Sequence, residues 1–370
     1  MTAPLLVPDL ALERWPSMDR YAAELAQRIP GLQVPREAAA LRGPRFVSRY
    51  LRYPHALRRY RPVLVHIADH SYAHCLRAFP GTPSVVTIHD LYPVHVLASG
   101  ARGWRAAARA AALRYVLDWL RRATHWIADS RFTADEATTL LGLPPERVTV
   151  VPLGVAPAFF ASPEAGAVER CRSRWRAALG GRPSPDAVFL LHVGSCVARK
   201  NVEGAIGALG VLRRQGIDAC LVQVGGRFGP AHRAAAEAAA VATQIHQEPQ
   251  VDEAGLLAAY AAADVLVMPS HYEGFGLPVL EAAAAGLPVV SSGAGALAEV
   301  DGDAVLVAPP ADASAFAAAV ARVVTDPAVR QALVERGRAH ARGFSWETTA
   351  RGVERVYDLL AGDAPASAAP

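Results

Sequence analysis

The sequence predicts an α/β protein with two Rossmann-like, doubly wound domains that face a cleft. At 370 residues the chain is longer than one hydrophobic core usually grows, so we expect two domains. Short apolar runs alternate with alanine-rich segments of helical period, a pattern typical of parallel strands joined by crossover helices. A proline-rich stretch near the middle of the chain separates two such series of strands.

The predicted strands fall into two groups. The first group comprises PVLVHIAD (62–69), SVVTIHD (84–90), HWIADS (125–130) and VTVVPLG (148–154). The second group comprises VFLLHVGS (188–195), ACLVQVGG (219–226), DVLVMPS (264–270) and LPVVSS (287–292). Each group therefore predicts one parallel sheet.

Proline spacing and helix-end signals give the domain boundaries. Prolines flank the helical pattern VERCRSRWRAAL, which indicates a connection between domains. Ser345 is a plausible N-cap for a last helix, expected to pack back toward the first domain, and Gly362 is its plausible end. The predicted division is 1–165 for the first domain, 166–186 for a linker, 187–345 for the second domain, 346–361 for the C-terminal helix and 362–370 for a disordered tail.

Composition narrows the class of protein. The four cysteines, Cys75, Cys171, Cys196 and Cys220, are scattered without CxxC spacing, which favours free thiols in a reducing cytoplasm. The sequence shows neither a signal-peptide pattern nor an apolar run of about 18 residues. A net charge of +4 without a recognition motif does not favour nucleic acid as a partner. We expect a cytoplasmic protein, with peripheral contact to the inner face of the membrane as an open alternative.

The stretch EGFGLPVLEAAAAGLPVV (273–290) is the first candidate site. Pro278 favours the start of a helix, so the preceding residues form a strand-to-helix loop at the carboxyl edge of a sheet. Its glycines let backbone N–H groups approach a phosphate, and Glu273 and Glu281 can hold two hydroxyl-bearing parts of the same ligand. The alternative is that Glu281 only stabilises a helix N-terminus and Glu273 is solvated.

The second candidate is LLHVGSCVARKN (190–201), a strand that ends in Gly194 and is followed by Arg199 and Lys200. These cations can neutralise a diphosphate, whereas the alternative is a solvated basic loop. Lys200 is the only lysine among 38 basic residues. Because an ammonium group is not interchangeable with a guanidinium, its retention favours a specific role.

These motifs resemble those of the retaining, GT-B-type glycosyltransferases of family 4, the group 1 glycosyltransferases. SHYEGFGLPVLEAAAAGLPVV matches the paired-glutamate motif, VGSCVARKN the phosphate loop, TIHDLYP the catalytic loop of the first domain and ERVTVVPLGV the strand before the linker. The resemblance covers nearly the whole chain. It implies a nucleotide-diphosphate sugar as co-substrate and no metal, flavin or nicotinamide.

The resemblance also implies roles for the donor residues. Glu281 would hold the ribose diol, Glu273 and the backbone that follows it the transferred sugar and its phosphates, and Arg199 with Lys200 the leaving group. The donor set is Gly194, Ser195, Arg199, Lys200, Glu273, Gly274, Phe275, Gly276, Leu277 and Glu281. Ser195 departs from the family, which usually has an arginine there, so Arg199 is expected to share that work.

In the first domain, His89 and Asp90 follow a predicted strand. A lone histidine there is more often structural, but the resemblance implies that His89 contacts the transferred sugar and that Asp90 orients the loop or an acceptor hydroxyl. The implied catalytic set is His89, Asp90, Glu273, Lys200 and Arg199. No nucleophile is evident, so the implied mechanism is front-face transfer in which the departing diphosphate takes the acceptor's proton.

Acceptor residues are less clearly marked. The family's glycine-rich loop after the first strand is replaced here by LALERWPSMDRYAAEL, in which Ser17 is a plausible helix N-cap. His66, His70 and His74 are spaced four apart, but a strand followed by a helix capped by Ser71 would keep them from converging on a metal. We expect His70, Tyr72 and Ser17 on the acceptor side.

The arginine-rich segment Arg42–Arg61 also contains aromatic residues at nearly helical spacing, interrupted by Pro54. It is either a solvated helix face with a core stripe or a surface that meets anionic lipid. The predicted function is transfer of a hexose, with a mannose-like sugar favoured, to a saccharide or lipid-linked saccharide. A hydrolysing epimerase or phosphorylase of the same architecture and a sugar-binding protein are the alternatives.

Overall fold

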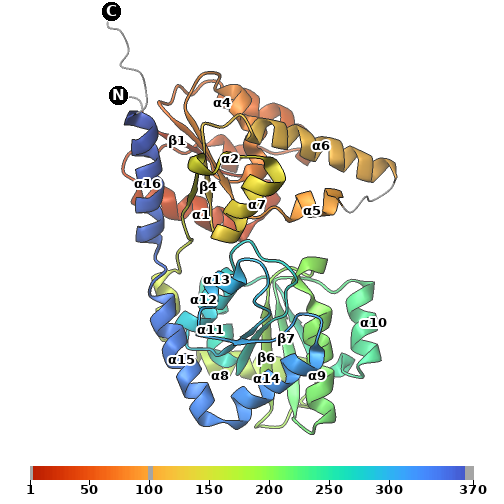
Figure 1. The fold of residues 1–370 in the computed structure, drawn as a ribbon. Helices are drawn as coiled ribbons and strands as arrows, with labels where there is room; N and C mark the ends of the chain where they lie inside the picture. Colours follow the sequence, from red (N-terminus) through yellow and green to blue (C-terminus); the bar gives the residue numbers. More distant parts are fainter. Residues whose placement is uncertain (1–2, 99–102, 363–370) are drawn as a thin grey trace, which may run out of the picture. The chain divides into compact units, whose positions relative to one another are not determined.

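The computed structural model describes residues 3–98 and 103–362, and it divides into two units. The first unit combines Met1–Gly154 with Trp346–Pro370, and the second is Val155–Ser345. Each unit has one parallel sheet covered by helices (Figure 1). This confirms the predicted class of two Rossmann-like α/β domains.

The sheet of the first unit has the order β1-β2-β3-β4-β5. Its strands are β1 (Leu5–Val7), β2 (Val65–Ile67), β3 (Ser84–Ile88), β4 (His125–Ala128) and β5 (Val148–Val150). Leu5 pairs with Val65 on one side and forms an isolated parallel bridge to Gln33 on the other. Strand β1 therefore has a parallel partner on each side, as in a doubly wound sheet. The sequence did not clearly predict β1 as a strand.

The helices of the first unit pack on both faces of this sheet. They are η1 (Ala11–Glu13), α1 (Pro16–Arg28), α2 (Glu37–Ala40), α3 (Arg45–Val47), the π-helical η2 (Ser48–Arg52), α4 (Tyr53–Leu57), η3 (His70–Ala78), α5 (Tyr92–Ala98), α6 (Trp104–Leu120), α7 (Arg131–Leu141), η4 (Pro145–Arg147) and α16 (Trp346–Gly362). The core is apolar, with Leu5, Ile67 and Ile88 fully buried.

The last helix, α16, belongs to the first unit, as predicted. Arg28 of α1 donates to Glu347 at 3.0 Å, and Thr349 donates to the carbonyl of Pro152 at 2.7 Å. The Tyr357 hydroxyl lies 2.7 Å from Nδ1 of His66 in β2. The buried face of α16 thus completes the core of the first unit. The predicted disordered tail, apart from Gly362, lies outside the described residues.

The sheet of the second unit has the order β11-β10-β9-β6-β7-β8. Its strands are β6 (Val188–Val193), β7 (Ala219–Val224), β8 (Ile245–Glu248), β9 (Val265–Met268), β10 (Val289–Ser291) and β11 (Leu306–Val307). Since the order reverses between β6 and β9, the crevice at the carboxyl ends of these two strands is the expected place for a ligand.

The helices of the second unit connect these strands and cover the sheet. They are η5 (Pro157–Phe160), α8 (Ala167–Ala178), η6 (Ala198–Lys200), α9 (Val202–Arg214), α10 (Pro230–Ala238), η7 (Ala242–Gln244), α11 (Glu253–Ala262), α12 (Leu277–Ala284), α13 (Leu297–Val300), α14 (Ala313–Thr325) and α15 (Pro327–Ala341). Helix α9 packs against α14, burying Ile206, Leu209 and Phe316.

Several local predictions differ from the structure. The predicted linker 166–186 contains α8, which belongs to the second unit because Trp175 is buried and its indole N–H donates to Glu248 at 2.8 Å. The division between units falls at Gly154 and Val155 instead. Pro54 does not interrupt its helix, because a π-helical turn over Ser48–Arg52 precedes it and the chain stays helical through Leu57.

Two predicted caps are also wrong. Ser17 lies inside α1, whose N-cap position is Trp15 and whose first residue is Pro16. Ser71 lies inside η3, and the cap is Asp69, whose carboxylate accepts from the backbone N–H of Ser71 at 2.6 Å. In both cases a residue that often caps a helix stands two positions after the N-cap, so its side chain does not lie beside the first N–H groups.

Candidate active site

The second unit places both predicted donor motifs at its switch point. The loop after β6 contains Gly194 and continues into η6 with Arg199 and Lys200, while the loop after β9 contains Glu273 and leads into α12. Because β6 and β9 are adjacent parallel strands, the two loops leave the same edge of the sheet side by side.

Glu273 lies at the centre of this site and is 4% exposed. The ammonium group of Lys200 donates to its two oxygens at 2.7 and 2.9 Å, and Arg199 donates at 3.2 Å. The hydroxyl of Ser270 donates at 2.7 Å. Burial opposes ionisation of Glu273, but Lys200 and Arg199 outweigh it and hold the pKa of this carboxyl below its ordinary value.

Asn201 holds the two loops together. It adopts a left-handed conformation at φ 48°, and its side-chain oxygen accepts from the backbone N–H of Gly204 to cap α9. Its amide nitrogen donates to the carbonyls of Pro269 and Pro310 at 2.8 and 2.7 Å. One asparagine thus caps the helix and fixes the loop after β9, a role that we did not predict.

Two glycines let neighbouring side chains pack closely against the backbone of the site. Gly194 has φ +143°, and a Cβ there would lie 3.5 Å from Cε of Lys200. Gly276, at φ +114°, is the N-cap of α12, and a Cβ there would meet Leu297 at 2.6 Å. Both positions need a backbone that glycine adopts readily, so the loop can run close to the Lys200 side chain and Leu297 can pack directly against the start of α12.

Glu281 lies one turn into α12, which begins at Leu277, and is 4% exposed. Its carboxylate accepts from the hydroxyl of Tyr260 in α11 at 2.9 Å. Among the other predicted donor residues, Ser195 is exposed and Phe275 is buried. The supporting residues Ser270, Asn201 and Tyr260 were missed. Of these three residues, only Asn201 lies within a predicted donor motif, next to Lys200.

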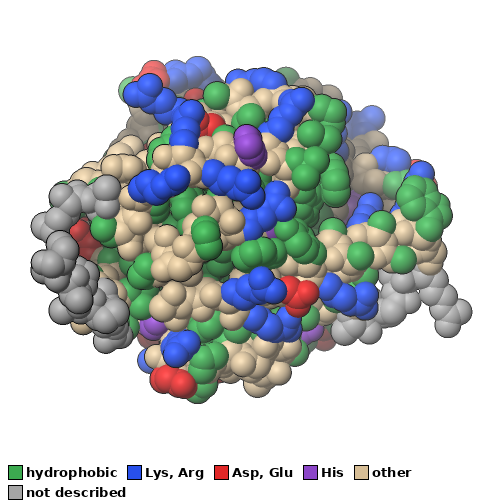
Figure 2. All heavy atoms as spheres, turned by 90° about the horizontal axis from the view of Figure 1, so that it is seen from above, with side chains coloured by type: hydrophobic (Ala, Val, Ile, Leu, Met, Phe, Trp, Pro, Cys, Tyr) green, Lys and Arg blue, Asp and Glu red, His purple; other side chains and the backbone are tan. Residues whose placement is uncertain are grey.

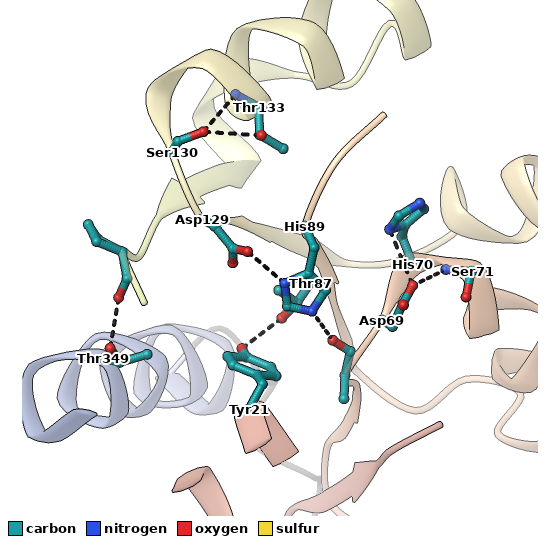
Figure 3. A network of polar contacts seen from close by, with 12 residues as sticks. Tyr21, Asp69, His70, Ser71, Thr87, His89, Asp129, Ser130, Thr133 and Thr349 are labelled. Atoms are coloured by element: carbon teal, nitrogen blue, oxygen red, sulfur yellow. Dashed lines mark hydrogen bonds and ion pairs between the residues drawn. The ribbon is translucent and has the colours of Figure 1, made fainter. Parts of the chain in front are cut away.

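In the first unit, His89 follows β3 and is buried (Figure 3). Its Nδ1 lies 2.6 Å from Oδ2 of Asp129, and its Nε2 lies 2.8 Å from the carbonyl oxygen of Ala68. Burial lowers the pKa of His89, but the Asp129 carboxylate outweighs burial and raises it to about 10. His89 is therefore an imidazolium at neutral pH that donates from both nitrogens. The residue Asp90 accepts from the backbone N–H of Tyr92 at 3.1 Å.

Beneath His89 lies a chain of buried hydroxyl and imidazole groups. Thr87 Oγ1 lies 2.9 Å from the Tyr21 hydroxyl (Figure 3). It also lies 2.7 Å from Nε2 of His66. The Tyr21 ring meets His89 edge to face, with centroids 5.0 Å apart. Burial lowers the pKa of His66 to about 3, so this imidazole is neutral while His89 is charged. The network fixes the loop that carries His89.

The predicted acceptor residues have different surroundings. His70 is buried beside Asp69, with its Nδ1 3.3 Å from Oδ1 (Figure 3), whereas Ser17 is exposed on α1. Tyr72 is fully buried, its hydroxyl donates to Glu13 at 3.0 Å, and the Arg49 guanidinium lies 4.3 Å from its ring centroid. Tyr72 therefore supports a buried Glu13–Arg49 pair.

The histidines at positions 66, 70 and 74 take separate partners. His66 bonds Thr87 and Tyr357, and Nε2 of His74 lies 3.0 Å from the carbonyl of Arg49. In the described ranges 3–98 and 103–362, no group of three or more His, Cys, Asp or Glu side chains is arranged to hold a metal ion. Nor does any helix in those ranges have the length and apolarity to cross a membrane.

Comparisons with known proteins agree with this geometry. The group 1 glycosyl transferase model matches residues 180–340, and the glycosyltransferase family 4 model matches residues 11–159. Glycogen synthase of Mycobacterium tuberculosis is 34% identical over 308 residues, which is 81% of this chain and 69% of that protein. O-antigen chain mannosyltransferase B of Escherichia coli is 48% identical over 101 residues, 27% of this chain and 26% of that protein.

Solved structures share the fold. Sucrose-phosphate synthase from Thermosynechococcus elongatus superposes with a TM-score of 0.76 at 22% identity, covering 97% of this chain and 99% of that one. Anabaena Alr3699/HepE, solved in complex with UDP and glucose, gives 0.75 at 15% identity, covering 97% and 100%. The resemblance seen in the sequence is thus confirmed: the chain is an enzyme that belongs to the group 1 glycosyltransferases of family 4 and has the GT-B fold.

Proposed function

We propose that this glycosyltransferase moves a hexose, with a mannose-like sugar favoured, from a nucleotide-diphosphate sugar to a saccharide or lipid-linked saccharide. The donor class rests on the cluster of Lys200, Arg199 and Glu273 at the switch point of the second sheet. The UDP bound in HepE supports a nucleotide donor, and the mannosyltransferase relative supports the sugar. A sugar-binding protein is excluded by membership of the enzyme family.

In the proposed reaction, Arg199 and Lys200 stabilise the negative charge that develops on the departing diphosphate. Glu281 accepts hydrogen bonds from the ribose hydroxyls, and His89, whose two nitrogens are held by Asp129 and Ala68, contacts the transferred sugar without donating to it. Glu273 is a poor nucleophile, because two cations and the Ser270 hydroxyl already occupy its oxygens. A front-face transfer with retention is therefore favoured. In this step the acceptor oxygen bonds to the anomeric carbon as the phosphate bond breaks, and the phosphate takes the acceptor's proton.

Because Arg199 and Lys200 supply positive charge at the diphosphate, we propose that no metal or other cofactor is needed. Turnover that is unchanged by EDTA would support this, and loss that is restored by Mg²⁺ would reject it. The anomeric configuration of the product, read from its proton NMR coupling constant, decides between retention and inversion.

The donor is identified by thermal-shift measurements with a panel of nucleotide diphosphates and their mannose and glucose derivatives. A ligand at 100 times its Kd stabilises the folded protein by about 2.7 kcal/mol, so a true donor gives a clear rise in Tm. Transfer to an acceptor must accompany that rise. If release of free sugar proceeds equally well without an acceptor, the chain is instead a hydrolytic enzyme, and no response to any nucleotide would reject the donor class.

The surface of Arg42–Arg61 supports a lipid-linked acceptor. Phe46 and Leu51 are 66% and 56% exposed among arginines. Figure 2 looks down on the α4 end of Figure 1 and shows basic side chains set among hydrophobic ones. We propose that this face contacts anionic lipid. Reversal of the exposed Arg52, Arg58 and Arg61 to Glu should abolish sedimentation with phosphatidylglycerol vesicles at low salt. The matched control reverses Arg182, Arg214 and Arg336, and equal sedimentation of both variants would reject this contact.

A further inference from the structure

Aspartates follow the first four strands of the first unit. Asp9, Asp69, Asp90 and Asp129 each lie within two residues of the end of β1, β2, β3 and β4. Since the carboxyl ends of parallel strands share one edge of the sheet, these acids gather there. Asp9, Asp69 and Asp129 are buried, at 5%, 5% and 1% exposure, and Glu13 adds another carboxyl at 5%.

All of these acids except Asp9 have partners. Asp129 pairs with His89, Asp69 accepts from Ser71, and Asp90 accepts from Tyr92. Glu13 accepts from Arg49 and from the Tyr72 hydroxyl. Both carboxyl oxygens of Asp9 are buried and lack a hydrogen-bond partner within the described part of the chain. An uncompensated buried carboxylate is costly, so its position calls for an explanation.

The nearby cations do not donate to Asp9. Arg49 acts on Asp9 electrostatically, but its Nη1 and Nη2 groups donate to Glu13 at 3.2 Å and to the carbonyl of Ser71 at 2.6 Å, and its buried Nε makes no hydrogen bond within the described residues. His89 also lies close, but both of its nitrogens are occupied. Burial, with Asp69 as a neighbouring acid, raises the pKa of Asp9 well above its ordinary value. Within the described residues, Asp9 therefore has positive charge nearby but no cationic group that donates a hydrogen bond to it.

We propose that Asp9 binds a positively charged nitrogen of the acceptor, and that the acceptor is an amino sugar or an aminocyclitol. An ammonium group supplies three donors and a full charge, whereas a hydroxyl supplies one donor and no charge. Among residues 3–98 and 103–362, the Ser71 hydroxyl and Oδ1 of Asp129 also have no hydrogen-bond partner and can bind ring hydroxyls; both residues lie at this edge in Figure 3. The inference rests on the proposed transfer function and names its acceptor class.

The test compares glucosamine with N-acetylglucosamine, which keeps the ring but has no charged nitrogen. Each sugar is titrated by calorimetry into the full-length protein without a donor. We expect glucosamine to bind at least 10-fold more tightly and Asp9→Asn to remove that difference. Asp118→Asn, which changes an exposed acid on α6, should preserve it. Equal affinities in the wild type, including no binding of either sugar, would overturn the inference, and so would an Asp9→Asn variant that keeps the preference.

A second measurement separates this role from a structural one. If Asp9 is a binding residue for a cationic ligand, Asp9→Asn removes an unpaired buried acid from the ligand-free protein and should raise Tm at pH 8. If Asp9 instead makes a structural contact, the substitution should lower Tm. The thermal-shift measurements with nucleotide diphosphates and their sugars test the transfer function independently. A donor response with no amine preference rejects only the acceptor class. Amine binding without any donor response rejects the transferase proposal and leaves the Asp9 site standing.

Discussion

The ammonium group of Lys200 lies 2.7 and 2.9 Å from the two carboxylate oxygens of Glu273, a residue 73 positions away in the sequence. The two residues follow β6 and β9, which are neighbours only because the strand order reverses between them. The fold thus places the only lysine of the chain against the glutamate of the predicted donor motif. Since Glu273 stays ionised, the two side chains hold each other in place at the expected donor site.

Lys200→Arg should lower kcat by about 10-fold or more, which corresponds to ~1.4 kcal/mol of transition-state stabilisation. The side chain is confined between Gly194 and Glu273, so a planar guanidinium cannot occupy the position of the ammonium nitrogen. Donor affinity should fall less, because a cation remains. Steady-state kinetics with the identified donor provide the measurement, with Arg214→Lys as an exposed control. A kcat within twofold of the wild type would remove Lys200 from the mechanism.

Glu281→Gln should raise the donor Kd by about 10-fold or more, because a charge-assisted hydrogen bond contributes about 1.5 to 3 kcal/mol. Glutamine keeps the shape of the side chain and can still accept from Tyr260. Tyr260→Phe is the matched control, since it removes that internal bond and leaves the carboxylate in place. Calorimetry with the nucleoside diphosphate alone tests the ribose contact. Unchanged affinity in Glu281→Gln, with weaker binding in Tyr260→Phe, would contradict the role given to Glu281.

The sequence predicted the strands with strong apolar runs and missed the weak ones. All eight predicted strands, including β6 and β9, are present. β8 (IHQE) and β11, with only two residues, lack a sustained apolar run, and β1 is short. Helix α8 was assigned to the linker because prolines indicate turns but do not show where the segment between them packs. Burial of Trp175 against Glu248 depends on β8, which the pattern did not reveal.

The candidate donor residues were visible because glycine, proline and acid occur together in one short motif. The supporting contacts were not, since Ser270, Asn201 and Tyr260 acquire their roles only when separate loops meet. The same holds for Asp9 and Asp129. Each is an ordinary acid in the sequence, and only the alignment of four strand ends in one sheet brings them together.

Asp301→Asn should stabilise the protein increasingly between pH 5 and pH 8. Asp301 is 2% exposed, and burial raises the pKa of its carboxyl from 3.8 to about 7. Because the pKa is higher in the folded than in the unfolded protein, proton binding by Asp301 stabilises the folded state. This stabilisation is fully present below pH 3.8 and is lost as the pH rises through 7. The wild type should lose up to about 1.4 kcal/mol per pH unit relative to the variant within this window. Urea unfolding across the pH range measures it. The exposed Asp303→Asn should show no such trend, and parallel curves for Asp301→Asn would refute the expectation.

The His89–Asp129 pair should make the protein lose stability at alkaline pH. The pKa of His89 rises from 6.5 to about 10, so its contribution is fully present below pH 6.5 and is lost as pH rises through 10. Asp129→Asn removes the carboxylate that holds this proton. The wild type should therefore be more stable than Asp129→Asn near pH 7, and the difference should shrink toward pH 10 by at most about 1.4 kcal/mol per unit.

Thermal unfolding of both proteins between pH 6 and pH 10 measures this difference. His66→Gln is the control, because burial lowers the pKa of His66 to about 3 and the imidazole does not titrate in this range. Its loss of stability should be the same at every pH, since Thr87 and Tyr357 lose the same neutral partner throughout. A constant difference between the wild type and Asp129→Asn would mean that His89 carries no proton bound by Asp129. The imidazole would then be neutral, and it could not donate from both nitrogens as the contacts to Asp129 and Ala68 require.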